Sequence, residues 1–167
     1  MAVREVVRYP HPALKGRAES ISPGPDAERL ARDLVETMRS SPACVGLAAP
    51  QIGEPLRVFC LDVTGHRRAT ASNGLVVMLD PIVESADGRE VVREGCMSLP
   101  DLTANVARAT SIVVAGLSPE GASIRFAAAG FEARAFQHEI DHLDGLLFLD
   151  RVSSLQTEVF RRKRYAR

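Results

Sequence analysis

The chain has 167 residues, of which 46% are hydrophobic and 25% charged, a composition typical of a globular domain with a buried core. Its formal net charge of zero argues against a polycation built for nucleic acid. The N-terminus lacks the apolar core of a signal peptide, and the longest apolar run, Leu75–Leu79, is too short to span a bilayer. Three cysteines without a secreted-protein pattern favour reduced thiols. We therefore expect one cytoplasmic, monomeric domain over residues 1–167 that does not contact membranes.

The first predicted helix spans residues 26–39. Apolar residues recur at helical spacing from Ala27 to Met38, and Asp26 follows a Pro-Gly-Pro loop in the manner of an N-cap. Ser40-Ser41-Pro42 is expected to end this helix.

The middle of the chain is β-rich. Residues 57–63 and 75–79 have strand character. Turn residues between strand-like runs predict two hairpins, one of residues 82–85 and 90–93 around Ala86-Asp87-Gly88, the other of residues 111–117 and 122–126.

A second helix is predicted from Gly130 to about Asp144, with Gly145 as its stop, and a third from Ser153 toward Tyr165. The order of helix, strands and helix predicts an α+β fold with short mixed or antiparallel sheets. On the second helix one apolar stripe should face the core, namely Ala133, Phe136, Ile140 and Leu143. A different face has the makeup of a pocket wall, with Phe131, Ala135, His138 and His142.

The hexapeptide Gln137-His138-Glu139-Ile140-Asp141-His142 carries the strongest chemical signal. Residues four apart share a helix face, so His138 and His142 could hold one metal ion. Glu139, next to a ligand, could carry protons for a water molecule activated by that metal. This is the H-E-x-x-H pattern of zinc hydrolases.

Two histidines leave a catalytic metal short of a third protein ligand. The longer zinc-endopeptidase pattern places a third histidine where this chain has Phe148, and a downstream glutamate would have to be Glu158 in the basic tail. Neither fits well. Cys96, in the segment Glu94-Gly-Cys-Met-Ser-Leu-Pro100, is a better candidate, since Cys/His/His plus water is a normal open coordination set.

A third segment, Gly46-Leu-Ala-Ala-Pro-Gln51, combines small residues with one neutral amide. Small residues let a substrate backbone approach closely, and the Gln51 carboxamide could donate to a developing oxyanion. The three segments Gly46–Gln51, Glu94–Ser98 and Gln137–His142, in this order and spacing, resemble the three motifs of the peptide deformylases, and the resemblance runs over nearly the whole chain.

The resemblance implies an α+β fold of short sheets around a central metal-binding helix. It implies one divalent ion held by Cys96, His138 and His142, usually Fe²⁺ in the cell, with Zn²⁺, Ni²⁺ or Co²⁺ as substitutes. It also implies removal of the formyl group from N-formylmethionine at the start of nascent chains, the reaction of the shorter bacterial type of deformylase.

The expected catalytic groups are the Glu139 carboxylate as general base and two oxyanion donors, the Gln51 amide and the Met97 backbone N–H. The methionine side chain should enter an apolar pocket lined by Val45, Phe131, Ala135 and the His138 ring. Main-chain bonds from Val45, Gly46 and Gly95 would align the peptide as an added strand.

Other interpretations accompany this one. A zinc endopeptidase is disfavoured by Phe148, and an inactive metal- or peptide-binding module by the intact set of Gln51, Cys96 and Glu139. Cys44 and Cys60 are expected to be packing residues, and Glu94 and Arg108 to form an ion pair that supports Cys96.

The basic segment 161–167 is either a solvated helix end or a contact to ribosomal RNA.

Overall fold

The computed structural model describes residues 3–163. These residues form the helices α1 (Pro25–Ser40), α2 (Gly130–Leu143) and the one-turn α3 (Leu155–Glu158), together with 3₁₀ turns at Pro12–Leu14, Ala49–Ile52 and Phe148–Arg151. The strands are β1 (Gly46–Ala48), β2 (Val58–Leu61), β3 (Val76–Asp87), β4 (Glu90–Cys96), β5 (Leu99–Arg108), β6 (Ser111–Leu117), β7 (Ser123–Ala129) and β8 (Val159–Arg161).

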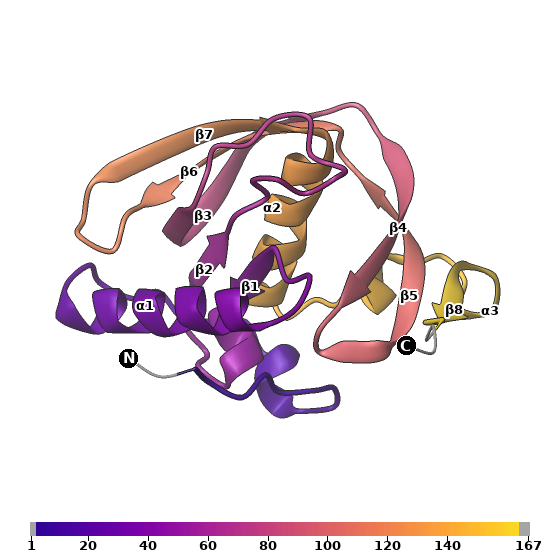
Figure 1. The fold of residues 1–167 in the computed structure, drawn as a ribbon, viewed down its shortest axis with the longest axis horizontal. Helices are drawn as coiled ribbons and strands as arrows, with labels where there is room; N and C mark the ends of the chain where they lie inside the picture. Colours follow the sequence, from indigo (N-terminus) through magenta and orange to yellow (C-terminus); the bar gives the residue numbers. More distant parts are fainter. Residues whose placement is uncertain (1–2, 164–167) are drawn as a thin grey trace.

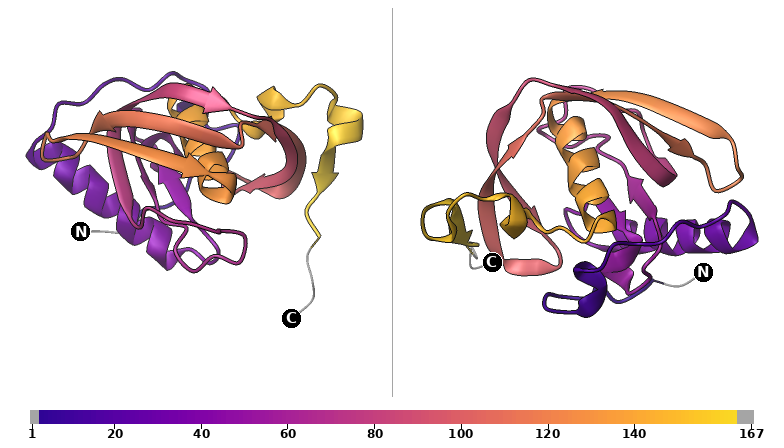
Figure 2. Two further views of the ribbon diagram at one scale, coloured as in Figure 1. Left: turned by 90° about the horizontal axis from the view of Figure 1, so that it is seen from above. Right: turned by 180° about the vertical axis from the view of Figure 1, so that it is seen from behind.

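The strands form two sheets. One has the order β1-β2-β3-β6-β7 and the other the order β4-β5-β8, and every strand pairing within them is antiparallel. Helix α2 lies between the two sheets, and α1 packs beside β1 and β2 (Figures 1 and 2). The α+β class predicted from the sequence is confirmed, with a central helix that carries both histidines of the hexapeptide.

Helix α2 is central because its apolar stripe is buried. Ala133, Phe136 and Leu143 are fully buried, and Ile140 packs against the same cluster. The Phe136 ring meets the Phe59 ring of β2 edge-on, with centroids 5.8 Å apart. The helix ends where expected, with Gly145 in the left-handed region at φ 74°. The stripe therefore fixes the rotation of α2 and aims the opposite side of the helix at the second sheet.

The predicted span of the first helix is confirmed, but its N-cap is not. Gly24 caps α1 and Pro25 is the first helical residue, so Asp26 lies inside the first turn. Proline suits that position because its fixed φ is helical and its missing N–H would have no intrahelical partner. The hairpin of β6 and β7 is confirmed, with Leu117 opposite Ser123.

The other predicted hairpin, of residues 82–85 and 90–93, is wrong. Strand β3 pairs with β2 and β6, whereas β4 pairs with β5 in the other sheet. The chain does turn at Gly88, whose φ is 70°, but there it passes from one sheet to the next. Turn residues indicate a change of direction without indicating which strand becomes the neighbour.

The third predicted helix, from Ser153 toward Tyr165, is also wrong over its described part. Ser154 caps a single turn, Leu155–Glu158, and the chain then forms β8 against β5. Val159 and Phe160 favour a strand, and β5 offers an edge with backbone groups to pair. Residues 164–167 of the basic tail lie outside the described residues. Within residues 3–163, no helix combines the length and hydrophobicity needed to cross a membrane.

Candidate metal centre

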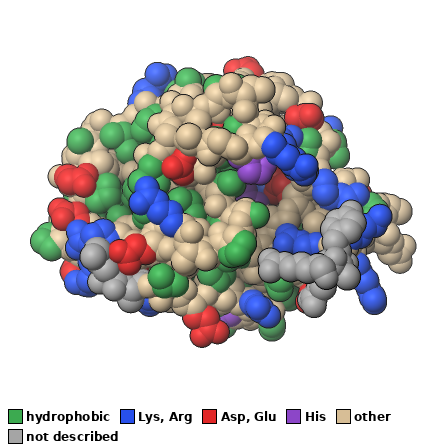
Figure 3. Space-filling model, viewed as in Figure 1, with side chains coloured by type: hydrophobic (Ala, Val, Ile, Leu, Met, Phe, Trp, Pro, Cys, Tyr) green, Lys and Arg blue, Asp and Glu red, His purple; other side chains and the backbone are tan. Residues whose placement is uncertain are grey.

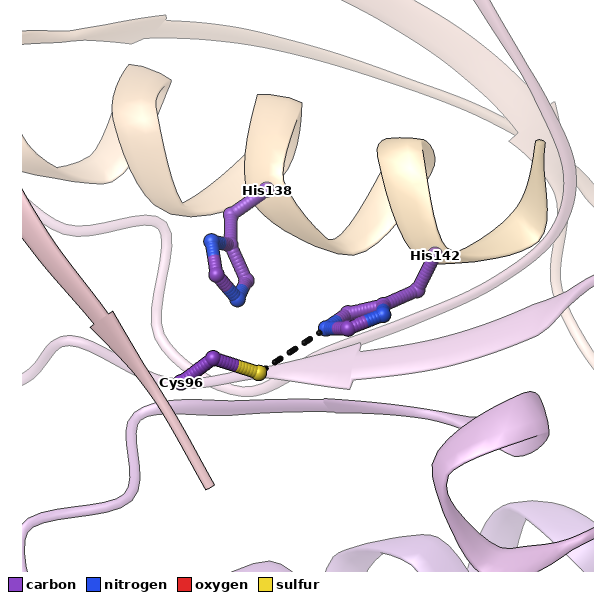
Figure 4. A group of neighbouring side chains, drawn as sticks. All are labelled: Cys96, His138 and His142. Atoms are coloured by element: carbon purple, nitrogen blue, oxygen red, sulfur yellow. Dashed lines mark hydrogen bonds between the residues drawn. The ribbon is translucent and has the colours of Figure 1, made fainter. Parts of the chain in front are cut away.

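The hexapeptide histidines and Cys96 converge on one point between α2 and the end of β4 (Figure 4). Their ligand atoms all lie within 4.8 Å of one another, and the Cys96 Sγ is 3.3 Å from Nε2 of His142. The two imidazole rings stand nearly perpendicular, with centroids 5.0 Å apart. One turn of helix supplies two ligand atoms, and the last residue of β4 supplies the third.

A chain of charged groups orients the first histidine. Nδ1 of His138 is 3.0 Å from Glu94 Oε2, so its other ring nitrogen is left to face a metal. Glu94 in turn accepts two hydrogen bonds from Arg108, at 2.7 and 2.9 Å. Arg108 also donates to Asp141 at 2.6 Å, and Arg151 donates to the same carboxylate. The expected Glu94–Arg108 pair is confirmed and extends further than the sequence indicated.

The electrostatics of the site favour an anionic sulfur. Burial alone would raise the pKa of the Cys96 thiol, but the neighbouring His142 and His138 bring that pKa well below its usual value. Burial likewise opposes ionisation of Glu94, yet hydrogen bonds from Arg108 and His138 lower its pKa to about 2. A thiolate is the form of cysteine that ligates metals.

Glu139 and Gln51 flank this triad. Burial raises the pKa of Glu139 to about 7, against the lowering effect of the two histidines. Its Oε2 is buried and has no hydrogen-bond partner among the described residues. The Gln51 Oε1 accepts from the Ala48 backbone N–H at 3.0 Å, which turns Nε2 toward Cys96 Sγ at 3.5 Å and Ser98 Oγ at 3.3 Å. The local backbone bond of Gln51 thus orients its amide donor toward the cavity.

These groups share one cavity of about 320 Å³. It is lined by the sequence-predicted residues Val45, Gly46, Gln51, Gly95, Cys96, Met97, Phe131, Ala135, His138 and Glu139. His142 is only 1% exposed and is not one of the residues that line the cavity, although its ligand atom lies within 4.8 Å of those of Cys96 and His138. Cys60 is a core residue as expected. Cys44 packs against the same core cluster, as expected, and it also lines the cavity and donates its thiol to the Gly46 carbonyl.

The sequence interpretation missed several cavity residues. His66 stacks face to face on the Phe131 ring, with centroids 4.2 Å apart, and the arginines Arg68, Arg93, Arg134 and Arg162 also line the cavity. The Arg67-Arg68 pair after a Gly-His turn was the one available signal. The others come from separate elements, so no local pattern joins them.

The family is decided by comparison with known proteins. A family model described as polypeptide deformylase matches residues 3–158 of this chain. The chain belongs to the polypeptide deformylase family. It is 39% identical over 164 residues to a peptide deformylase of Thermodesulfovibrio yellowstonii, covering 98% of this chain and 97% of the relative. It is 42% identical to that of Desulforudis audaxviator, covering 98% of this chain and 99% of the relative.

Solved deformylase structures share the fold. A peptide deformylase from Legionella pneumophila has a TM-score of 0.84 at 33% identity, covering 93% of this chain and 89% of the other. A Met-ala-ser bound peptide deformylase from Acinetobacter baumannii has a TM-score of 0.82 at 31% identity, covering 90% of this chain and 99% of the other.

The residues of this deformylase fit a transition metal. Sulfur and imidazole nitrogen suit Fe²⁺, Zn²⁺, Ni²⁺ or Co²⁺, whereas Mg²⁺ and Ca²⁺ prefer oxygen ligands. The three ligand atoms are buried or half-buried and close enough to meet at one ion. Glu139 Oε2 beside them is buried and has no hydrogen-bond partner among the described residues, so it can accept a hydrogen bond from a water molecule or ligand in the site. Three protein ligands leave room for a further, exchangeable one.

Proposed function

We propose that this chain is a metal-dependent hydrolase that removes the formyl group from N-formylmethionine at the start of nascent polypeptides. The observation that carries the proposal is the Cys96/His138/His142 triad at the base of a cavity that also holds Gln51 and Glu139. Family membership gives the reaction, and the triad supplies the intact ligand set. We further propose that the chain acts as one monomeric catalytic domain in the cytoplasm.

The apolar side of the cavity suits the methionine side chain. Val45, Phe131 and Ala135 line it together with the His138 ring. A polarizable thioether packs well against such aromatic and aliphatic groups. Main-chain groups of Val45, Gly46 and Gly95 border the same cavity and can pair with an extended peptide. A Met-ala-ser peptide, bound by the Acinetobacter relative, is the expected product class.

The residues on the polar side of the cavity transfer the proton and stabilise the negative charge that develops during the reaction. Glu139 Oε2 takes the proton of the attacking water and delivers it to the leaving amine nitrogen. The Gln51 Nε2 and the Met97 backbone N–H donate to the oxyanion that forms on the formyl carbon, each worth about 3 kcal/mol of barrier. When bound, a divalent transition metal supplies Lewis acidity toward the carbonyl and acidifies water. Loss of the amine releases formate.

The test is formate release from formyl-Met-Ala-Ser by metal-replete protein. We expect turnover with this peptide and none with the acetylated peptide or with an internal amide of a longer peptide. Cleavage of the internal amide would instead support an endopeptidase. Metal binding without any hydrolysis would support an inactive binding module.

For the resident ion we propose Fe²⁺. A thiolate-ligated Fe²⁺ is prone to oxidation, and the thiolate itself can be oxidised. Activity of the iron form should decay in air, whereas that of the Ni²⁺ form should persist. Identical half-lives of the two forms would contradict an oxygen-sensitive iron centre.

For the basic segment 161–167 we propose contact with ribosomal RNA, motivated by five positive charges in seven residues. Co-sedimentation with bacterial ribosomes at low and moderate salt, with the full chain and a chain ending at Phe160, tests this because the shorter chain lacks all five charges. Equal sedimentation of both chains would mean that the basic segment 161–167 is only a solvated end of the chain.

A further inference from the structure

Four arginines line the cavity that holds the candidate metal ligands, and we call them the arginine rim. Arg68 comes from the segment between β2 and β3, Arg93 from β4, Arg134 from α2, and Arg162 follows β8. The whole chain is formally neutral, so this gathering of cations is local. Figure 3 shows basic side chains around the hollow on this face of the molecule.

The rim is only partly neutralised by acidic residues. Arg134 lies 3.4 Å from Glu90, and of the two carboxylates lining the cavity, Glu94 is already bonded to Arg108 and His138. Among residues 3–163, neither Arg68 nor Arg162 has a carboxylate within ion-pair distance. Unpaired cations beside a cavity can attract an anionic group of a ligand.

Arg93 is held in place by three contacts. Its Nε donates to Asn105 at 2.9 Å and its Nη1 to Thr103 at 3.3 Å. Its guanidinium also stacks over the Phe160 ring of β8, 3.7 Å from the centroid. None of these contacts within residues 3–163 uses Nη2, so it can donate to a ligand acceptor, and the held guanidinium loses less entropy when it does so.

Arg162 reaches the same face because Gly95 has no side chain. Arg93 and Gly95 are two apart on β4, so they face the same side of the sheet, as does Thr103 opposite Gly95. A Cβ at Gly95 would overlap Nη2 of Arg162. The Arg162 guanidinium therefore lies against the backbone of the residue that precedes the ligand Cys96. Any peptide that pairs with Gly95 must pass beside this cation.

We propose that Arg162 and Arg93 form a carboxylate-binding subsite, so that the enzyme prefers formyl-methionyl peptides with Asp or Glu in the second or third position. This inference rests on the proposed deformylase function. An extended peptide advances about 3.4 Å per residue, so the one or two side chains after methionine reach the rim. Planar guanidinium groups match the geometry of a carboxylate. A cavity of about 320 Å³ continuous with the triad suits a peptide better than a nucleic acid strand.

The test compares kcat/KM for formyl-Met-Glu-Ser, formyl-Met-Gln-Ser and formyl-Met-Lys-Ser at low ionic strength. We expect the glutamate peptide to exceed the lysine peptide by about tenfold, and high salt to reduce the ratio. Arg162→Glu should bring the ratio to one or below, and Arg162→Gln should reduce it about threefold. Arg29→Glu, on α1 and outside this cavity, changes the net charge equally and should leave the ratio unchanged.

Binding of the product peptides Met-Glu-Ser and Met-Lys-Ser, measured by calorimetry on the metal-replete protein, gives the same comparison without turnover. Absence of formate from every formyl peptide would defeat the proposed function, whereas tighter binding of Met-Glu-Ser that depends on Arg162 would still support the subsite. Equal kcat/KM and equal binding for the two peptides would overturn the subsite and leave the function intact. Arg162-dependent binding of a single-stranded RNA oligomer without peptide discrimination would also overturn it.

Discussion

Gly46→Ala should disable the enzyme by moving the Glu139 carboxylate. A Cβ at Gly46 would lie 2.5 Å from Oε1, 2.9 Å from Cδ and 3.0 Å from Cγ of Glu139, so the carboxylate must shift by about 0.9 Å to reach an ordinary contact. Glu139 is 4% exposed, and its neighbours limit where it can go. A misplacement of about 1 Å can cost about 10²-fold in rate. We therefore expect kcat for formyl-Met-Ala-Ser to fall about 100-fold with metal content unchanged.

Gly16→Ala is the matched control. There the nearest atom to an added Cβ is the Pro12 carbonyl oxygen at 3.9 Å, so the change adds the same methyl group without a clash. Both substitutions restrict the unfolded chain similarly. Formate release and metal analysis of the two variants give the comparison. If Gly46→Ala turns over within threefold of Gly16→Ala, the position of the Glu139 carboxylate does not govern the rate and the reasoning is refuted.

Four further substitutions probe the site. Cys96→Ala should lose most of its metal, measured by elemental analysis, because two histidines leave the ion under-coordinated; full metal content would mean that another residue is the third ligand. Glu139→Ala should keep the metal yet lose at least about 10²-fold in kcat, since general acid–base catalysis contributes that much; parallel loss of metal would make it a structural residue. Gln51→Ala should lower kcat about 10²–10³-fold with little change in KM, because its donor serves the transition state; a change in KM alone would contradict that role. Arg108→Leu should lower the free energy of unfolding, measured in urea, by about 3–5 kcal/mol, because it leaves buried acids unpaired; a loss under 1 kcal/mol would contradict the buried network.

Local signals predicted the elements whose stability is local. The helical spacing of residues 26–39, the turn at residues 118–121 and the glycine stop at Gly145 each involve neighbours in the sequence, and all three appear in the structure. The Cys96/His138/His142 triad could also be predicted from the sequence, because its residues lie in short motifs with distinctive residue types. The wrong hairpin at residues 82–93 involved a choice of partner strand, which depends on contacts made far along the chain.

The C-terminal segment shows a different limit of sequence patterns. Residues 153–165 have helical character on their own, but the edge of β5 provides hydrogen-bond partners that an isolated segment lacks. Tertiary pairing outweighed local propensity there and made β8. The consequence reaches the site, because β8 places Phe160 under Arg93 and carries Arg162 to Gly95. The helix predicted for residues 153–165 therefore gave no indication that Arg162 lies at the cavity.

Arg108 connects the fold to the geometry of the metal centre. It is 4% exposed at the end of β5 and bonds Glu94 on β4 and Asp141 on α2, so one side chain ties the three-stranded sheet to the central helix. Burying an arginine costs several kcal/mol unless its donors are satisfied, and here two carboxylates satisfy them. Because Glu94 also holds Nδ1 of His138, the same bonds that join sheet to helix fix the ring that faces Cys96. One buried ionic network thus holds Cys96 on β4 and His138 on α2 at a fixed separation. This role explains why charged residues occupy buried positions where apolar residues would cost less free energy.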